Sequence, residues 1–185
     1  LDSQEESEID VLLNELQNSD ILYKVGMELF YTFGESMIKK IQSTGHGIFL
    51  DLKLHDIPHT VHKTLFSLMK YNVDIINVHA LGGKEMLLAA REALQEGALF
   101  FKTTPPKLIA FTHLTSFDQS SLEDIGIKEE ILKSTIDLAE LSYSCGLDGV
   151  VCSPLEVKMI KENTKENFIC ITPGIRDAKD SLRDQ

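Results

Sequence analysis

Short apolar runs alternate with amphipathic segments along the whole chain, and this alternation constrains the fold more than any other feature. We predict strands at 21–27, 48–53, 73–80, 107–114, 149–153 and 168–172. We predict helices at 4–16, 34–44, 58–71, 82–95, 129–145 and 154–162. Strands that alternate with helices, without hairpin signals of the Asn-Gly type, form parallel sheets with crossover helices. The sequence therefore predicts an α/β fold in a single domain, residues 1–185.

Polar side chains fall at or just beyond the C-terminal ends of these strands. They are Lys24, Asp51, Lys53, His79, Thr115 and Arg176. In a closed barrel such ends share one rim, whereas an open sheet has its ligand crevice at a single switch point. No Gly-x-Gly-x-x-Gly follows a strand, which disfavours a dinucleotide-binding sheet. We therefore expect a (β/α)8 TIM barrel truncated at both ends, with its first strand reduced to a stub at residues 1–2 and its last strand absent.

Charge and hydropathy exclude several classes of protein. A formal net charge of −11 over 185 residues leaves no basic footprint for nucleic acid or an anionic membrane. No apolar run approaches the ~18–20 residues of a membrane helix, and we find no basic n-region with a cleavage site in the first residues of the sequence. The three cysteines contain no Cys-x-x-Cys pair, so free thiols are expected rather than disulfides or a zinc site. We expect a cytoplasmic protein that binds neither nucleic acid nor membrane.

Segment 49–60 carries two acids and a lysine at an unusual spacing. Side chains alternate along a strand, so Asp51 and Lys53 share one face while the leucines between them share the other. Asp56 follows where the strand ends, and Lys24 belongs to the preceding strand. A solvated salt-bridge network is the ordinary explanation for any two such charges. Four of them, two within otherwise apolar strands, indicate a functional site.

The same segment, Phe-Leu-Asp-Leu-Lys-Leu-His-Asp-Ile-Pro-His-Thr, closely resembles the signature of the orotidine 5′-monophosphate decarboxylase family. Other segments agree in the family's order. They are Lys-Val-Gly-Met-Glu-Leu-Phe from Lys24, Asn-Val-His-Ala-Leu-Gly-Gly from Asn77, Leu-Thr-Ser from Leu114, Gly-Leu-Asp-Gly-Val-Val-Cys-Ser from Gly146 and Thr-Pro-Gly-Ile-Arg from Thr172. The resemblance spans nearly the whole chain and is greatest to bacterial members. It implies conversion of orotidine 5′-monophosphate to UMP, the last step of pyrimidine nucleotide synthesis, by a homodimer without metal or organic cofactor.

The resemblance also implies catalytic roles for the four charged residues. Lys53 is expected to deliver a proton to C6 of the pyrimidine after carbon dioxide leaves. Asp51 is expected to lie against the substrate carboxylate, and Lys24 to orient and balance the array. Asp56 is expected to cross a dimer interface into the neighbouring active site.

Five further residues are implied to bind substrate. Thr60 belongs to the segment that crosses the interface and is expected to contact the ribose. Thr115 corresponds to the residue that meets the pyrimidine edge. Asp2 is expected to contact the ribose and the first lysine of the array, and Arg176 and Gln185 are expected to contact the phosphate.

Elementary electrostatics is consistent with such an array. Two like charges 4 Å apart at an effective dielectric near 20 repel by roughly 4 kcal/mol. Asp51 would repel a substrate carboxylate beside it, and this repulsion would disappear as carbon dioxide departs. The Lys53 ammonium group would then attract the negative charge that develops on the carbanion. Flanking carboxylates also favour the charged, proton-donating form of the lysine.

Three alternatives stay open at this point. His55, His59 and His62 resemble a metal-ligand string, although no carboxylate completes an obvious set. A magnesium-dependent sugar-phosphate decarboxylase or synthase of the same superfamily shares the Asp-x-Lys-x-x-Asp strand. A non-enzymatic nucleotide-binding barrel is the third alternative. Whatever the ligand, we expect the polar segment 115–126 to be a loop over the site.

Overall fold

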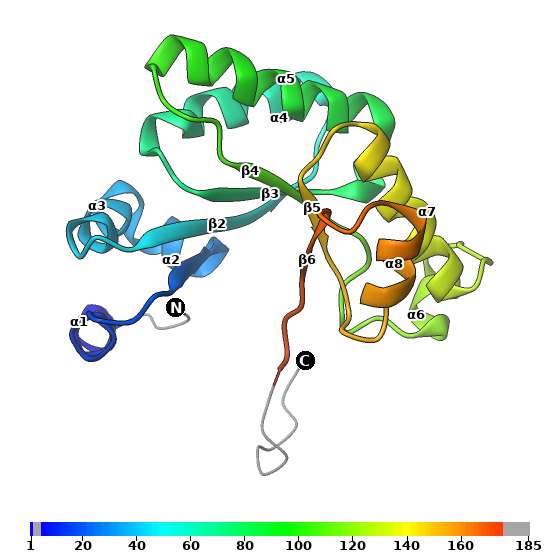
Figure 1. Ribbon diagram of the computed structural model, residues 1–185, viewed down its shortest axis with the longest axis horizontal. Coiled ribbons are helices and arrows are strands. Elements are labelled where there is room, and N and C mark those ends of the chain that lie inside the picture. The colour runs from blue at the N-terminus through cyan, green and yellow to red at the C-terminus, as the bar shows by residue number, and fades with distance from the viewer. Residues whose placement is uncertain (2–4, 176–185) are drawn as a thin grey trace.

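Six parallel strands pair in their chain order to form one curled sheet (Figure 1). The computed structural model describes residues 1 and 5–175. The strands are β1 Leu22–Gly26, β2 Gly47–Leu54, β3 Ile75–His79, β4 Lys107–Phe111, β5 Gly149–Val151 and β6 Ile169–Ile171. The predicted alternation and the parallel direction of the strands are therefore confirmed, and the C-terminal ends of all six strands lie on one side.

Helices follow the strands and cover the outer face of the sheet. In Figure 1, α3, α4, α5, α7 and α8 form an arc around it, whereas the inner face is turned away from these helices. The helices are α1 Glu6–Glu15, α2 Met27–Phe33, α3 Glu35–Ser43, α4 Pro58–Leu68, α5 Gly83–Phe101, α6 Gln119–Asp124, α7 Ile131–Ser144 and α8 Val157–Asn163. Two short 3₁₀ turns, η1 Met69–Tyr71 and η2 Ala80–Gly82, follow α4 and β3.

The two faces of the sheet carry separate apolar clusters, as the alternation along 48–54 predicts. Ile48, Leu50 and Leu52 of β2 belong to the large core between the sheet and the helices. Phe49 points the other way and packs with Ile109 and other residues of the inner face. Full burial of one such side chain contributes about 1.5–3 kcal/mol. In the described residues the inner face therefore carries an apolar cluster of its own, separate from the core beneath the helices.

The first residue of the chain lies beside β1. The Leu1 nitrogen donates a hydrogen bond of 3.0 Å to the carbonyl oxygen of Lys24, which is where the predicted stub of a preceding strand would lie. Asp2, the other residue of that stub, lies outside the described residues. Within the described ranges the sheet has six strands.

Two helices were not predicted from the sequence. α2 occupies the seven residues between β1 and Gly34, whose φ of 57° ends the helix; a segment this short shows no clear helical period. α6 lies inside segment 115–126, so the prediction of a polar loop throughout this segment was wrong for Gln119–Asp124. The Asp118 side chain caps α6 by accepting a 2.9 Å hydrogen bond from the Ser121 N–H, and Leu122 is fully buried. None of the helices described could span a membrane.

Candidate active site

A pocket of about 230 Å³ opens at the C-terminal ends of the strands. Its lining includes Lys24 from β1, Asp51 and Lys53 from β2, Phe111 from β4, Thr115 after β4 and Ile171 from β6. Residues distant in sequence meet here because parallel neighbouring strands end on the same side of a sheet. Two lysines and one acid are therefore held above the apolar inner face.

Asp51 is the centre of the charged cluster. Its Oδ1 accepts hydrogen bonds from Lys53 Nζ (2.8 Å) and from Asn77 Nδ2 (2.6 Å), and its Oδ2 lies 3.3 Å from Lys24 Nζ. Burial by itself raises the pKa of Asp51, which is only 3% exposed, but the hydrogen bonds and the charges of the two lysines lower it below its usual value. The carboxylate is consequently ionised at neutral pH and paired on both oxygens.

A bulge in β2 places Lys53 in an uncommon backbone conformation. Leu50 pairs with Ile76 and the next pair is Leu54 with Val78, so β2 advances four residues where β3 advances two. Lys53 has a φ of 51°, in the left-handed region that residues other than glycine rarely adopt. Strained backbone of this kind is found disproportionately at functional sites.

The Lys53 ammonium group also lies over an aromatic ring. Its Nζ is 4.6 Å from the centroid of the Phe111 ring, an arrangement in which the negative face of the ring attracts the cation. Together with the bond to Asp51, this contact points the ammonium group into the pocket, where it could donate a proton to a bound ligand.

Three histidines lie beside the cluster. The His79 ring stacks on His55 with centroids 5.3 Å apart and lies 6.3 Å from Phe111. Burial, and then the neighbouring groups His55, His113 and Lys53, lower the pKa of His79 to about 4. The Nδ1 atoms of His79 and His113 are buried without a hydrogen-bond partner in the described part of the chain. His79 is therefore neutral at pH 7 and adds no positive charge beside Lys53.

The structure brings only some of the candidate residues together. Lys24, Asp51, Lys53 and Thr115 line the pocket. Asp56 and Thr60 lie outside it, on an exposed stretch that follows β2 and begins α4. The Asp56 carboxylate accepts a 2.7 Å hydrogen bond from the Ile57 N–H. Asp2, Arg176 and Gln185 lie outside the described residues.

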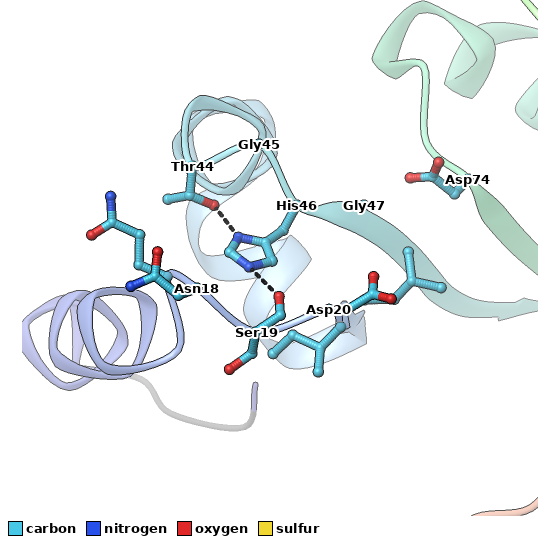
Figure 2. A pocket seen from close by; sticks show the side chains of 11 residues that line it. Asn18, Ser19, Asp20, Thr44, Gly45, His46, Gly47 and Asp74 are labelled. Carbon is cyan, nitrogen blue, oxygen red and sulfur yellow. Dashed lines mark hydrogen bonds between the residues drawn. The ribbon is translucent and has the colours of Figure 1, made fainter.

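A second, larger pocket of about 660 Å³ lies at the opposite end of the strands. Figure 2 shows His46 in this pocket, with Nδ1 2.8 Å from Thr44 Oγ1 and Nε2 3.1 Å from the Ser19 carbonyl oxygen. Both ring nitrogens are thus engaged within the protein. Since active sites of (β/α) barrels lie at the C-terminal ends of their strands, we assign the site to the smaller pocket despite its size.

No group of three or more His, Cys, Asp or Glu side chains in residues 1 and 5–175 could hold a metal ion. His62 instead pairs with Glu96, with Nε2 3.2 Å from Oε2. The three cysteines are free thiols, as expected.

Sequence reasoning missed two residues that contact the lysine–acid pair. Asn77 contacts Asp51 and Lys53 from the neighbouring strand, and Phe111 lies beneath Lys53. The available signal for Asn77 was a polar residue inside the apolar run Ile75–His79. Phe111 gave no such signal, because an aromatic residue near the end of a buried strand is ordinary core composition.

Comparison with known proteins gives one consistent result. The family model described as "Orotidine 5'-phosphate decarboxylase / HUMPS family" matches residues 1–185. An orotidine 5'-phosphate decarboxylase of Listeria innocua serovar 6a is 45% identical over 186 residues, covering 100% of this chain and 79% of its own. One of Lactococcus lactis subsp. lactis is 46% identical over 187 residues, covering 100% and 78%. The crystal structure of orotidine 5'-phosphate decarboxylase from Lactobacillus acidophilus matches with a TM-score of 0.85 and 40% identity, covering 95% of this chain and 79% of that one.

Proposed function

Since the chain belongs to the orotidine 5′-phosphate decarboxylase/HUMPS family, we propose that it converts orotidine 5′-monophosphate to UMP and carbon dioxide in pyrimidine nucleotide synthesis. The observation that carries this proposal is the Asp51 carboxylate, buried and held between Lys53 and Lys24 at the mouth of the sheet. This array offers a negative charge beside the substrate carboxylate and an ammonium group beside the carbon that the carboxylate leaves.

The reaction needs one bond broken and one proton delivered. As the bond from C6 to the carboxylate carbon breaks, its electron pair stays on C6 and carbon dioxide departs. Lys53 Nζ then gives a proton to C6, and the neutral amine regains a proton from solvent. Because Lys53 is held by Asp51 and Phe111 before substrate arrives, little reorganisation is needed at the moment of reaction.

Electrostatic repulsion can supply part of the rate enhancement. A substrate carboxylate 4 Å from Asp51 is repelled by roughly 4 kcal/mol at an effective dielectric near 20. Relief of all of that repulsion in the transition state would be worth about 10³-fold in rate, at ~1.4 kcal/mol for each factor of ten. The remaining acceleration must come from stabilisation of the carbanion by the lysine.

The active site is proposed to be shared between two subunits. Asp56 and Thr60 lie on an exposed segment, where Ile57 is 66% exposed. The exposure of this segment leaves it accessible to a second subunit, and its assignment to the partner's site follows from the family resemblance. In this proposal the partner subunit's Asp56 completes the charged array, and the partner subunit's Thr60 contacts the ribose.

The remaining substrate contacts are proposed from the resemblance. Thr115 would meet the pyrimidine edge, which is supported by its place in the pocket lining. Asp2 would contact the ribose and Lys24, and Arg176 and Gln185 would contact the phosphate. We further propose that the six strands belong to a single eight-stranded (β/α) barrel, because they curl in chain order with helices on the outer face. The cytoplasmic location stays a prediction.

A spectrophotometric assay tests the proposed function. The full-length protein should cause loss of orotidylate absorbance and release one equivalent of carbon dioxide, with no loss of activity in EDTA. Activity on a sugar phosphate that EDTA abolishes would instead identify the magnesium-dependent relative. Binding of UMP without turnover of orotidylate would identify a non-enzymatic nucleotide-binding protein.

A further inference from the structure

The bulge in β2 leaves a gap in the hydrogen-bond ladder between β2 and β3. Between the pairs Leu50 with Ile76 and Leu54 with Val78, the backbone of β3 offers only one residue to face the extra residues of β2. That residue is Asn77. A bulged residue normally loses its ladder partner, so the backbone N–H of Lys53 requires a different acceptor.

The Asn77 side chain supplies that acceptor and a donor at once. Its Oδ1 accepts a 2.7 Å hydrogen bond from the Lys53 backbone N–H, and its Nδ2 donates a 2.6 Å hydrogen bond to Asp51 Oδ1. Asn77 is completely buried. The orientation of the amide is fixed by chemistry, since only its oxygen can accept from an N–H and only its nitrogen can donate to a carboxylate.

We propose that Asn77 is a positioning residue, which sets the carboxylate of Asp51 and the left-handed backbone of Lys53 relative to each other. Asn77 is not among the residues that line the pocket, so it acts through its two neighbours and not on the substrate. The Asn77 amide thereby connects the bulge, which orients Lys53, to the Asp51 carboxylate that Lys53 contacts. This inference rests on the proposed decarboxylase function.

Two substitutions in the full-length protein separate positioning from general support of the fold. Asn77→Ala removes both hydrogen bonds, and misplacement of reacting groups by about 1 Å can cost ~10²-fold in rate. We therefore expect kcat to fall by about 100-fold while the Kd for UMP changes by less than about threefold. UMP lacks the carboxylate that faces Asp51. Its affinity therefore shows whether the pocket is intact and does not depend on the charged array.

Asn77→Asp gives a pH signature that a merely structural role would not produce. The new side chain keeps an oxygen for the Lys53 N–H but places a second carboxyl group against Asp51. When both are ionised they repel, whereas a protonated Asp at position 77 can donate a hydrogen bond as the amide did. The ratio of variant to wild-type kcat should therefore rise by about tenfold from pH 8 to pH 5, while the ratio for Asn77→Ala stays flat.

Ile76→Val is the matched control. Ile76 neighbours Asn77 on β3 but belongs to the core between sheet and helices, so its truncation lowers stability without touching the array. It should keep wild-type kcat and the wild-type pH profile. Wild-type kcat in both Asn77 variants, or losses of kcat matched by equal losses of UMP affinity, would overturn the positioning role. A wild-type protein that does not consume orotidylate would overturn the proposed function itself.

Discussion

Lys53 Nζ donates a 2.8 Å hydrogen bond to Asp51 Oδ1, two residues earlier on the same strand. The bulge in β2 and the contact with Asn77 lie on the same short stretch of chain. The acid and the ammonium group therefore meet in the protein itself, before any ligand binds. A site that is organised in advance needs less reorganisation free energy during the reaction.

A shared active site predicts complementation between two inactive variants. In a mixed dimer Lys53→Ala and Asp56→Asn fall in the same active site, so the other site of that dimer carries neither substitution. Random mixing makes about half of the dimers mixed, which should restore roughly a quarter of wild-type activity. The assay is orotidylate turnover after the two variants are denatured together and refolded.

The control for complementation uses two substitutions from the same pocket. Lys53→Ala mixed with Lys24→Ala should restore no activity, because each site then carries one of the two defects. Equal recovery in both mixtures, or no recovery with Asp56→Asn, would contradict the assignment of Asp56 to the partner's site.

The buried His79 should make the folded state sensitive to acid. Its pKa of about 4 lies below the ordinary value of 6.5, so between these values the unfolded chain binds a proton that the folded chain does not. Stability should therefore fall as the pH drops from about 6.5 to 4. The loss is at most about 3 kcal/mol, and less to the extent that solvent reaches the ring.

Urea unfolding from pH 7.5 to 4 measures this effect. His79→Phe keeps a ring against His55 and Phe111 but cannot titrate, so its stability should depend less steeply on pH in that window. His59→Gln, at an exposed position, should follow the wild-type curve. A His79→Phe curve parallel to wild type would show that His79 does not carry the effect.

Gly149 should tolerate no side chain. A Cβ atom there would lie 2.3 Å from the carbonyl oxygen of Ile169, which belongs to the backbone of the paired strand β6 and cannot move aside easily. We expect Gly149→Ala to cost about 1–3 kcal/mol or more of unfolding free energy.

Gly97→Ala is the comparison for that substitution. Its Cβ would also be too close to a neighbour, at 2.5 Å, but the neighbour is the flexible side chain of Met69. Alanine also favours the helix by about 1 kcal/mol over glycine. Thermal unfolding should therefore show a clearly smaller loss for Gly97→Ala than for Gly149→Ala, and the reverse order would contradict this account of strand packing.

Much of the fold could be predicted because its signals are local. The period of the apolar residues identified the strands, and alternation along β2 correctly placed Asp51 on the opposite face from Leu50 and Leu52. The short helices α2 and α6 were missed because a helix of one or two turns depends on a cap and a few tertiary contacts rather than on a period. The capping residue Asp118 was visible in the sequence but reads equally as loop composition.

The candidate site was predicted in part for the same reason. The spacing of Asp51, Lys53 and Lys24 is visible in the sequence, and the structure brings these three residues together. The contacts of Asn77 could not be foreseen, because they join residues that are 24 and 26 positions apart in the sequence. They also depend on a bulge, and the register of that bulge is determined only when the strands pair. The contributions of Asp2, Arg176 and Gln185 remain predictions.

The central claim is that Lys53 donates the proton, and single-turnover decarboxylation by Lys53→Ala tests it most directly. General acid catalysis typically contributes 10²–10⁴-fold, so orotidylate consumption should fall by at least about 10²-fold. UMP should still bind, and the exposed-site control Lys63→Ala should keep wild-type rates. Decarboxylation by Lys53→Ala within tenfold of wild type, in a folded protein that binds UMP, would contradict the assigned role of Lys53.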